Sequence, residues 1–191
     1  MKKQKSVLSI VSALAILLLT SFAWSENNAF EEWDPHFDTG DMSYFAAIGF
    51  SPWWGRVGLA LNPGVEYIVG EHRVGEAVPL SFGIAGIGSF VSDVNYGFSE
   101  LGITVAGMGT AHLGFKNVGE PFEWLENFDV YIGLGLSLDL LQPGWYGHSR
   151  IRIASKQGTN YFIRDNFAVY IENAYLGRFR NYLTAGVLWK M

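Results

Sequence analysis

The sequence contains no cysteine and few charged residues for its length. Charged side chains make up 16% of its 191 residues, whereas a soluble domain carries about 25%. The absence of cysteine excludes disulfides, thiolate metal sites, a cysteine nucleophile and the acceptor of a lipoprotein anchor. The low charge predicts either a large apolar core or a surface that contacts lipid, and a chain this short cannot build a very large core.

Hydrophobic runs long enough to cross a membrane as a helix are also missing after the N-terminus. Residues 1–25 combine three lysines near the start, an apolar run from Val7 to Leu19, and the small residues Ala23 and Ser25. These are the three parts of a secretory signal peptide. We therefore expect residues 1–25 to be cleaved. The alternative is a membrane anchor, which needs ~20 apolar residues.

Acidic residues dominate the net charge, which is −5 at pH 7. Removing the three leader lysines makes the mature chain still more negative, and this excludes a nucleic-acid-binding surface. Residues 26–42 are acidic with interleaved aromatic side chains, and Pro35 interrupts any helix there. We expect this stretch to form a periplasmic N-terminal segment in front of a barrel at residues 43–191.

Apolar residues recur at every second position through the rest of the chain, which is the period of a β-strand. In the clearest case, residues 128–140, the even positions are large and apolar and the odd positions are small or polar, apart from Tyr131. The alternation occurs in eight segments, at residues 43–50, 56–70, 78–90, 97–115, 128–140, 149–154, 167–174 and 181–191. The sequence therefore predicts an all-β fold, an eight-stranded antiparallel barrel.

Two features favour a barrel that crosses a membrane over a soluble one. A membrane barrel turns its large apolar residues outward, and the opposite face here is rich in glycine, alanine and serine, which suits a narrow interior. Aromatic residues also gather near the expected strand ends, where girdles lie; these are Trp53, Trp54, Trp124, Trp145, Tyr146 and Trp189. Turns are expected at residues 51–55, 142–147 and 157–160.

The last residues of the chain follow a short pattern formed by Thr184, Gly186, Trp189 and Met191. It resembles the C-terminal signal that bacterial outer-membrane barrels present to their insertion machinery, with Met191 at a position that is usually aromatic. With the leader and the eight segments, the mature chain is similar to the small outer-membrane barrels of the OmpA, OmpX and OmpW types. The resemblance implies an up-and-down transmembrane barrel in the cell outer membrane, a monomer with both termini in the periplasm.

The inward-facing positions of such a barrel carry charges of both signs. An eight-stranded barrel is only wide enough for side chains to fill it, and unpaired buried charges are costly. We therefore expect an ion-pair network in the lumen, in which Arg150 or Arg152 pairs with a carboxylate. Its members are Glu66, His112, Asp139, Arg150, Arg152 and Glu172. A path for water or ions is the alternative.

These features indicate a structural, surface-interaction or minor-pore role, with no cofactor or metal and with outer-membrane lipid and the insertion machinery as partners. A lipid A-modifying enzyme is a second hypothesis, with His112, His148, Ser149, Ser137 and Asp139 as candidate groups. Adjacent strand residues point to opposite faces, so His148 and Ser149 make a poor catalytic pair. A soluble periplasmic barrel of lipocalin type is the third hypothesis.

Overall fold

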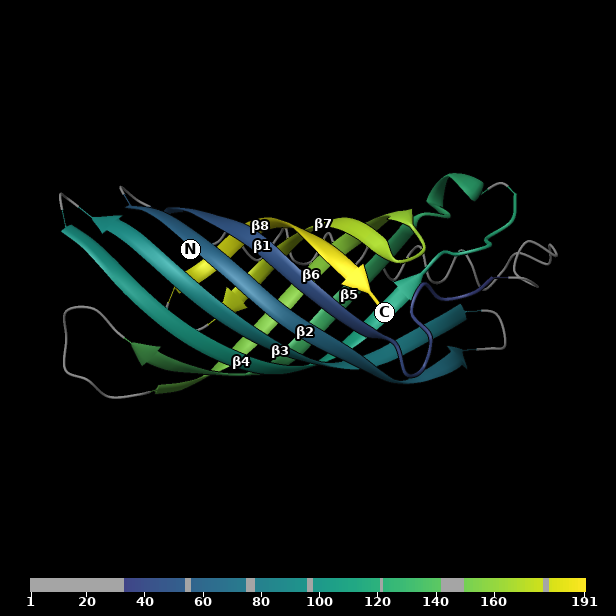
Figure 1. Ribbon diagram of the computed structural model, residues 1–191, viewed down its shortest axis with the longest axis horizontal. Coiled ribbons are helices and arrows are strands. Elements are labelled where there is room, and N and C mark those ends of the chain that lie inside the picture. Colours follow the sequence, from purple (N-terminus) through teal and green to yellow (C-terminus); the bar gives the residue numbers. More distant parts are fainter. Residues whose placement is uncertain are drawn as a thin grey trace, which may run out of the picture.

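The computed structural model describes residues 33–53, 56–74, 78–95, 98–120, 122–141, 150–176 and 179–191. Eight strands close into one antiparallel barrel, in which each strand pairs with the next and β8 pairs with β1 (Figure 1). They are β1 Met42–Trp53, β2 Arg56–Val74, β3 Val78–Asn95, β4 Phe98–Gly114, β5 Phe128–Leu141, β6 Arg150–Arg164, β7 Phe167–Leu176 and β8 Phe179–Lys190. The predicted eight-stranded up-and-down barrel is confirmed. The predicted signal peptide and the turn at 142–147 lie outside the described residues.

Alternating burial accounts for the strands. Along β5, Ile132 and Leu134 are 64% and 67% exposed, whereas Tyr131 and Asp139 are 5% and 2% exposed. Successive side chains of a strand point to opposite faces, so one face of each strand lines the interior and the other forms the outer surface. The large apolar face is the outer one, as the sequence predicts.

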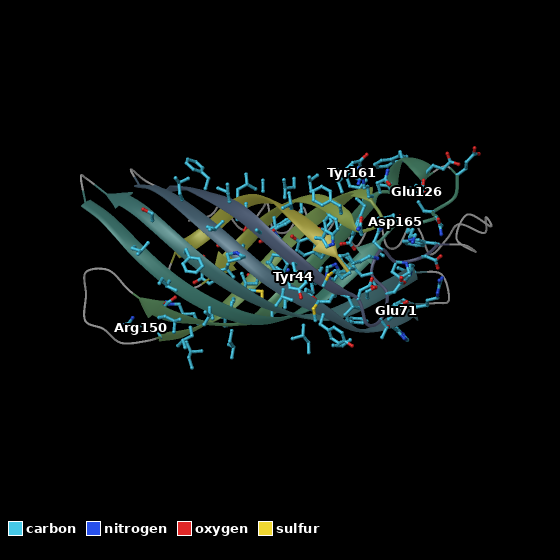
Figure 2. All side chains as sticks on the ribbon, in the orientation of Figure 1. Tyr44, Glu71, Glu126, Arg150, Tyr161 and Asp165 are labelled. Carbon is cyan, nitrogen blue, oxygen red and sulfur yellow. The ribbon has the colours of Figure 1, made fainter. Side chains whose placement is uncertain are left out.

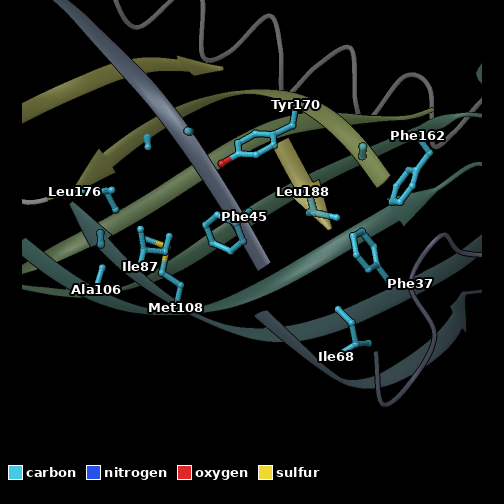
Figure 3. Packing of buried hydrophobic residues seen from close by; sticks show 14 residues of the cluster. Phe37, Phe45, Ile68, Ile87, Ala106, Met108, Phe162, Tyr170, Leu176 and Leu188 are labelled. Carbon is cyan, nitrogen blue, oxygen red and sulfur yellow. The ribbon is translucent and has the colours of Figure 1, made fainter. Parts of the chain in front are cut away.

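Aromatic rings fill the interior by lying over glycines of neighbouring strands. Phe45 stands opposite Gly64 in the register of β1 and β2, and a Cβ atom on Gly64 would lie 2.3 Å from the Phe45 ring. The same arrangement pairs Tyr131 with Gly158 and Tyr170 with Gly186. These glycines are therefore required by the close approach of an aromatic side chain. Figure 3 shows two of these side chains, Phe45 and Tyr170, inside the barrel.

Strand β6 is longer than the sequence predicts, and the expected turn at residues 157–160 is wrong. Gln157 lies within β6, opposite Ile132 of β5 and Asn173 of β7. The apolar alternation stops after Ile153 because the next outward positions are Ser155, Gln157 and Thr159. Strand β1 likewise continues to Trp53, into the turn expected at residues 51–55.

Both ends of the described chain lie at the same end of the barrel (Figure 1). There the connection between β4 and β5 contains a short 3₁₀ helix, Glu123–Leu125. Residues 33–41, called the strap below, lie against this end before β1 begins. No helix in the described part of the chain is long and apolar enough to cross a membrane.

Candidate functional site: the charged interior of the barrel

The outer surface carries large apolar side chains between its two ends. Exposed examples come from every strand and include Ile48, Leu59, Ile84, Leu101, Leu134, Ile153, Ile171 and Leu183. Exposed aromatic rings lie toward both ends of the barrel: Tyr44, Tyr67, Phe82, Tyr161 and Trp189 toward the end that holds the termini, and Phe50 and Phe90 toward the other. Charged groups lie at the barrel ends, with Arg150 at one end and Glu71, Glu126 and Asp165 at the other (Figure 2). The polarity is the inverse of that of a soluble protein.

His112 lies in the interior between two carboxylates. Its Nδ1 is 3.0 Å from Asp129 Oδ2 and its Nε2 is 3.0 Å from Glu66 Oε1, and all three side chains are at most 2% exposed. A neutral imidazole donates from only one ring nitrogen, so contact of both nitrogens with carboxylates favours the imidazolium. Thr110 donates a further hydrogen bond to Glu66, and Asn160 Nδ2 donates to Asp129 Oδ2 at 2.7 Å.

Lys156 supplies a second positive charge to this cluster. Its Nζ is 3.9 Å from Glu66 Oε2, and it lies 4.8 Å from the ring centroid of Phe45 and 4.9 Å from that of Tyr131. Cation–π contacts of this kind strengthen when the ammonium is removed from water. Sequence reasoning missed Lys156 because it ended strand six at residue 154. Continuing the period of two from Ala154 would have found it.

Glu172 projects into the same interior from β7. Tyr131 donates a hydrogen bond from its hydroxyl to Glu172 Oε2 at 2.8 Å, and Thr184 Oγ1 lies 3.4 Å from Oε1. The cluster therefore joins side chains of β2, β4, β5, β6, β7 and β8. Such a network fixes the strands relative to one another, since loss of any member leaves a buried partner unsatisfied.

A separate ion pair lies nearer the other end of the barrel. Arg152 Nε donates to Asp139 Oδ2 at 3.0 Å, and Thr104 Oγ1 donates to Asp139 Oδ1 at 2.9 Å. Arg152 thus pairs with one of its expected carboxylates. Arg150 instead is exposed at the start of β6, and the partners of Glu66 among the described residues are His112 and Lys156 rather than an arginine. Of the six predicted residues, three belong to the central cluster (Glu66, His112 and Glu172), two form the second ion pair (Asp139 and Arg152), and Arg150 lies at the rim.

The strap closes the end of the barrel beneath the central cluster. Trp33 and Phe37 are fully buried, Trp33 Nε1 donates to Gly114 O at 2.7 Å, and Ser81 Oγ donates to Phe37 O at 2.6 Å. Lys190 Nζ donates to the main-chain carbonyl of residue 36 at 2.6 Å. The described part of the acidic segment predicted at residues 26–42 thus seals the barrel end.

His36 holds the strap against the connection between β4 and β5. Its Nε2 donates to Glu126 O at 2.7 Å, and its ring stacks on Phe162 with centroids 4.3 Å apart. Burial lowers the pKa of His36 below its ordinary value of 6.5, while the Asp129 carboxylate and the Glu126 carbonyl act in the opposite direction. The neutral imidazole is therefore the form that the docked strap favours.

The interior offers little room for a ligand or a catalytic reaction. A cavity between Glu66, Lys156 and Tyr170 holds about one water molecule. Of the candidate catalytic groups, His112 is held by two carboxylates, Asp139 belongs to the other layer, and Ser137 is buried. His148 and Ser149 lie outside the described side chains. Across the described residues, no group of three or more potential ligands is arranged to hold a metal ion.

The residues of the C-terminal pattern lie on β8 and just after it. Thr184 is buried, Gly186 is half-buried, and Trp189 and Met191 are exposed on the outside of the barrel. Strand β8 pairs with β1 as well as β7. The terminal pattern is thus on the strand that closes the barrel, and its part in insertion stays a prediction.

No family model matches the chain, and no curated protein matches it. One solved structure, described as "De novo design of transmembrane beta-barrels", aligns with a TM-score of 0.45 at 12% sequence identity. The alignment covers 81% of this chain and 98% of the designed one.

Proposed function

We propose that the protein is an outer-membrane β-barrel with a closed interior and a structural or surface-interaction role. The observation that carries the proposal is the inverted polarity: Leu134 is 67% exposed, whereas Glu66 and His112 are each 2% exposed. An apolar outer face is stable in contact with lipid. A closed barrel also pairs its backbone N–H and C=O groups between strands, as the water-free bilayer core requires. Strand β5, with 14 residues, exceeds the ~9–11 residues that a spanning strand needs.

The leader and the terminal pattern support delivery to the outer membrane. In this proposal residues 1–25 direct export, and the pattern ending in Trp189 and Met191 is recognised by the barrel insertion machinery. The termini lie in the periplasm in this proposal. The C-terminal ends of β1, β3, β5 and β7, and the loops that follow them, then face the outside of the cell. Surface interaction would then use those loops, since the strap occupies the periplasmic end.

A closed interior argues against conduction. Ile87 and Met108 pack in the interior with Phe45, whose ring lies against Lys156 of the central cluster (Figure 3), and the strap covers one end. The soluble lipocalin-type alternative needs an internal ligand cavity and a polar outer face, and the described residues provide neither. The lipid A-modifying alternative needs its reactive groups near the lipid, whereas His112 and Asp139 point inward.

Cell fractionation followed by gel electrophoresis with and without boiling tests the proposal. We expect the protein in the outer-membrane fraction, with a mobility that changes on heating because folded barrels resist detergent. Recovery in the soluble fraction without such a change would refute it. Planar-bilayer recording tests the closed interior, for which we expect no conductance; steady single-channel currents from pure protein would show an open lumen instead.

A further inference from the structure

The outer face of the described barrel contains a polar area on β6 and β7 among its apolar side chains. On β6 the outward residues Ser155, Gln157 and Thr159 follow Ile153, and on the neighbouring β7 the outward residue Asn173 stands directly opposite Gln157. Gln157 and Asn173 are both exposed. We call these two side chains the amide patch.

Gln157 lies midway between the ends of β6, and Asn173 lies three residues before Leu176, the last residue of β7. Gln157 is seven residues from Arg150 and seven from Arg164, or about 23 Å along the strand in each direction. Exposed apolar residues flank it along the strand at Ile153 and Tyr161. Across the sheet its neighbours are Ile132 on β5 and, beyond Asn173, Leu183 on β8. Gln157 is therefore surrounded by apolar surface at the depth where a bilayer has only hydrocarbon, and Asn173 extends the patch toward the end of β7.

The barrel itself does not use these amides. Thr159 directs its hydroxyl to Asp129 O at 3.2 Å, but neither amide has a side-chain hydrogen bond among the described residues. An amide exposed to hydrocarbon without a partner costs about 1–3 kcal/mol by protein mutational data. Polar side chains at such positions characteristically mark sites of function or association.

We propose that the amide patch is the contact between two copies of this chain, which pair through β6 and β7 in the membrane. This proposal rests on the membrane embedding argued above. Each amide is uncharged and carries both donors and acceptors, so the patch is complementary to itself. A two-fold axis along the membrane normal brings identical residues together at identical depth, and therefore pairs Gln157 or Asn173 of one copy with those amides of the other.

The surroundings of the patch suit a close contact between barrels. Ser155 on β6 and Ala185 on β8 are small outward residues beside it, and small residues let neighbouring elements approach in membranes. Acyl chains cannot accept or donate hydrogen bonds, and lipid head groups lie at the bilayer surfaces rather than at this depth. A second copy of the chain presents the same amide donors and acceptors at the same depth, so it can hydrogen-bond the patch.

Cysteine crosslinking tests the contact, because the chain has no native cysteine. In the full chain embedded in lipid vesicles, Ser155→Cys places a thiol beside the patch. Gly107→Cys is the matched control, since Gly107 is exposed within β4 and a Cβ there meets nothing within 4 Å. We expect oxidation to give disulfide-linked dimers for Ser155→Cys and at most a trace for Gly107→Cys. Equal yields at the two positions would overturn the proposal.

Replacing both amides tests their role directly. Energy transfer between donor- and acceptor-labelled copies, labelled through Val74→Cys at the rim, measures dimerisation in vesicles. We expect Gln157→Leu with Asn173→Leu to weaken dimerisation about tenfold, which matches the loss of two modest hydrogen bonds in a membrane. The heat-dependent gel mobility of the monomer should be kept.

Each outcome separates this proposal from the membrane claim. A heat-shifting barrel in vesicles that shows no energy transfer, or equal transfer with and without the amides, overturns the dimer but leaves the membrane claim standing. When the same variant is oxidised in whole cells, crosslinking of Ser155→Cys to a different membrane protein without a homodimer likewise overturns it. Failure to insert into vesicles at all would instead remove the proposed function on which it rests.

Discussion

The edge of the Phe37 ring contacts the imidazole of His112, with ring centroids 4.7 Å apart and ring planes at 61°. This contact joins the strap to the charged interior. Phe37 also meets Phe162 at 5.6 Å, so one side chain closes the barrel end against residues of β4 and β6. The strap is therefore part of the interior packing rather than an appendage.

Phe37→Ala should destabilise the folded barrel by about 3–5 kcal/mol, the usual cost of truncating a buried phenylalanine. The free energy of unfolding in urea, measured in lipid vesicles, checks this. Val74→Ala serves as the control because Val74 is 51% exposed at the end of β2, and its effect should be below about 0.5 kcal/mol. Similar small changes in both variants would mean that the strap does not pack as described.

His112→Ala should cost about 3–5 kcal/mol, because it leaves the buried Glu66 and Asp129 carboxylates without their shared partner. Adding Asp129→Asn to this variant should recover part of the loss, because Glu66 keeps Lys156 as a charged partner whereas Asp129 keeps only the neutral Asn160 among the described side chains. A double-mutant cycle in the same unfolding assay measures the coupling. Strictly additive effects of the two substitutions would contradict the network.

Acidification should loosen the strap. Because the pKa of His36 is lowered on docking, the undocked strap binds a proton more readily, and stability contributed by docking is full above about pH 6.5 and falls as the pH drops below it. Hydrogen exchange of the Trp33 indole, expressed as a protection factor, reports docking. His36→Gln should remove most of the change between pH 7 and 5. The same pH dependence in that variant would assign the effect to another group.

Gly64→Ala should destabilise the barrel by about 1–3 kcal/mol through overpacking, because the added carbon would meet the Phe45 ring at 2.3 Å and the Gly86 carbonyl at 2.8 Å. Gly107→Ala provides the matched control, since its added carbon points into open space on the outer face. We expect Gly107→Ala to be neutral or slightly stabilising in the urea assay. The reverse order would show that the inward and outward faces of these strands have been exchanged.

The strand number and the facing of most residues could be predicted because both depend on local alternation. In β5 the side-chain period runs without interruption from Phe128 to Leu140, and that period specifies which residues share a face. The small residues on the odd-numbered face then indicate that this face points inward. The existence of a charged interior followed from the same pattern. The length of β6 could not be predicted, since the apolar alternation stops at Ser155, Gln157 and Thr159 within the strand.

The partners within the interior could not be predicted, because they depend on register. Glu66 meets His112 across 46 positions and Asp129 meets it across 17, and the alternation does not specify such distances. The packing of the strap could not be predicted either, since the sequence of an acidic segment with Trp33 and Phe37 does not indicate which residues these rings contact. The sequence analysis missed both Lys156 and the amide patch for the same reason: polar outward residues interrupt the apolar alternation of β6. Departures from a local pattern often mark functional positions.

A cysteine scan along β5 tests the central claim, that the outer face contacts lipid, most directly. Single substitutions such as Ile132→Cys, Leu134→Cys and Ser137→Cys can be labelled in outer-membrane vesicles with a lipid-soluble or a water-soluble thiol reagent. We expect the even-numbered positions to react with the lipid-soluble reagent alone and the buried odd-numbered positions to react with neither. Rapid reaction of Leu134→Cys with the water-soluble reagent would contradict a membrane-embedded outer face.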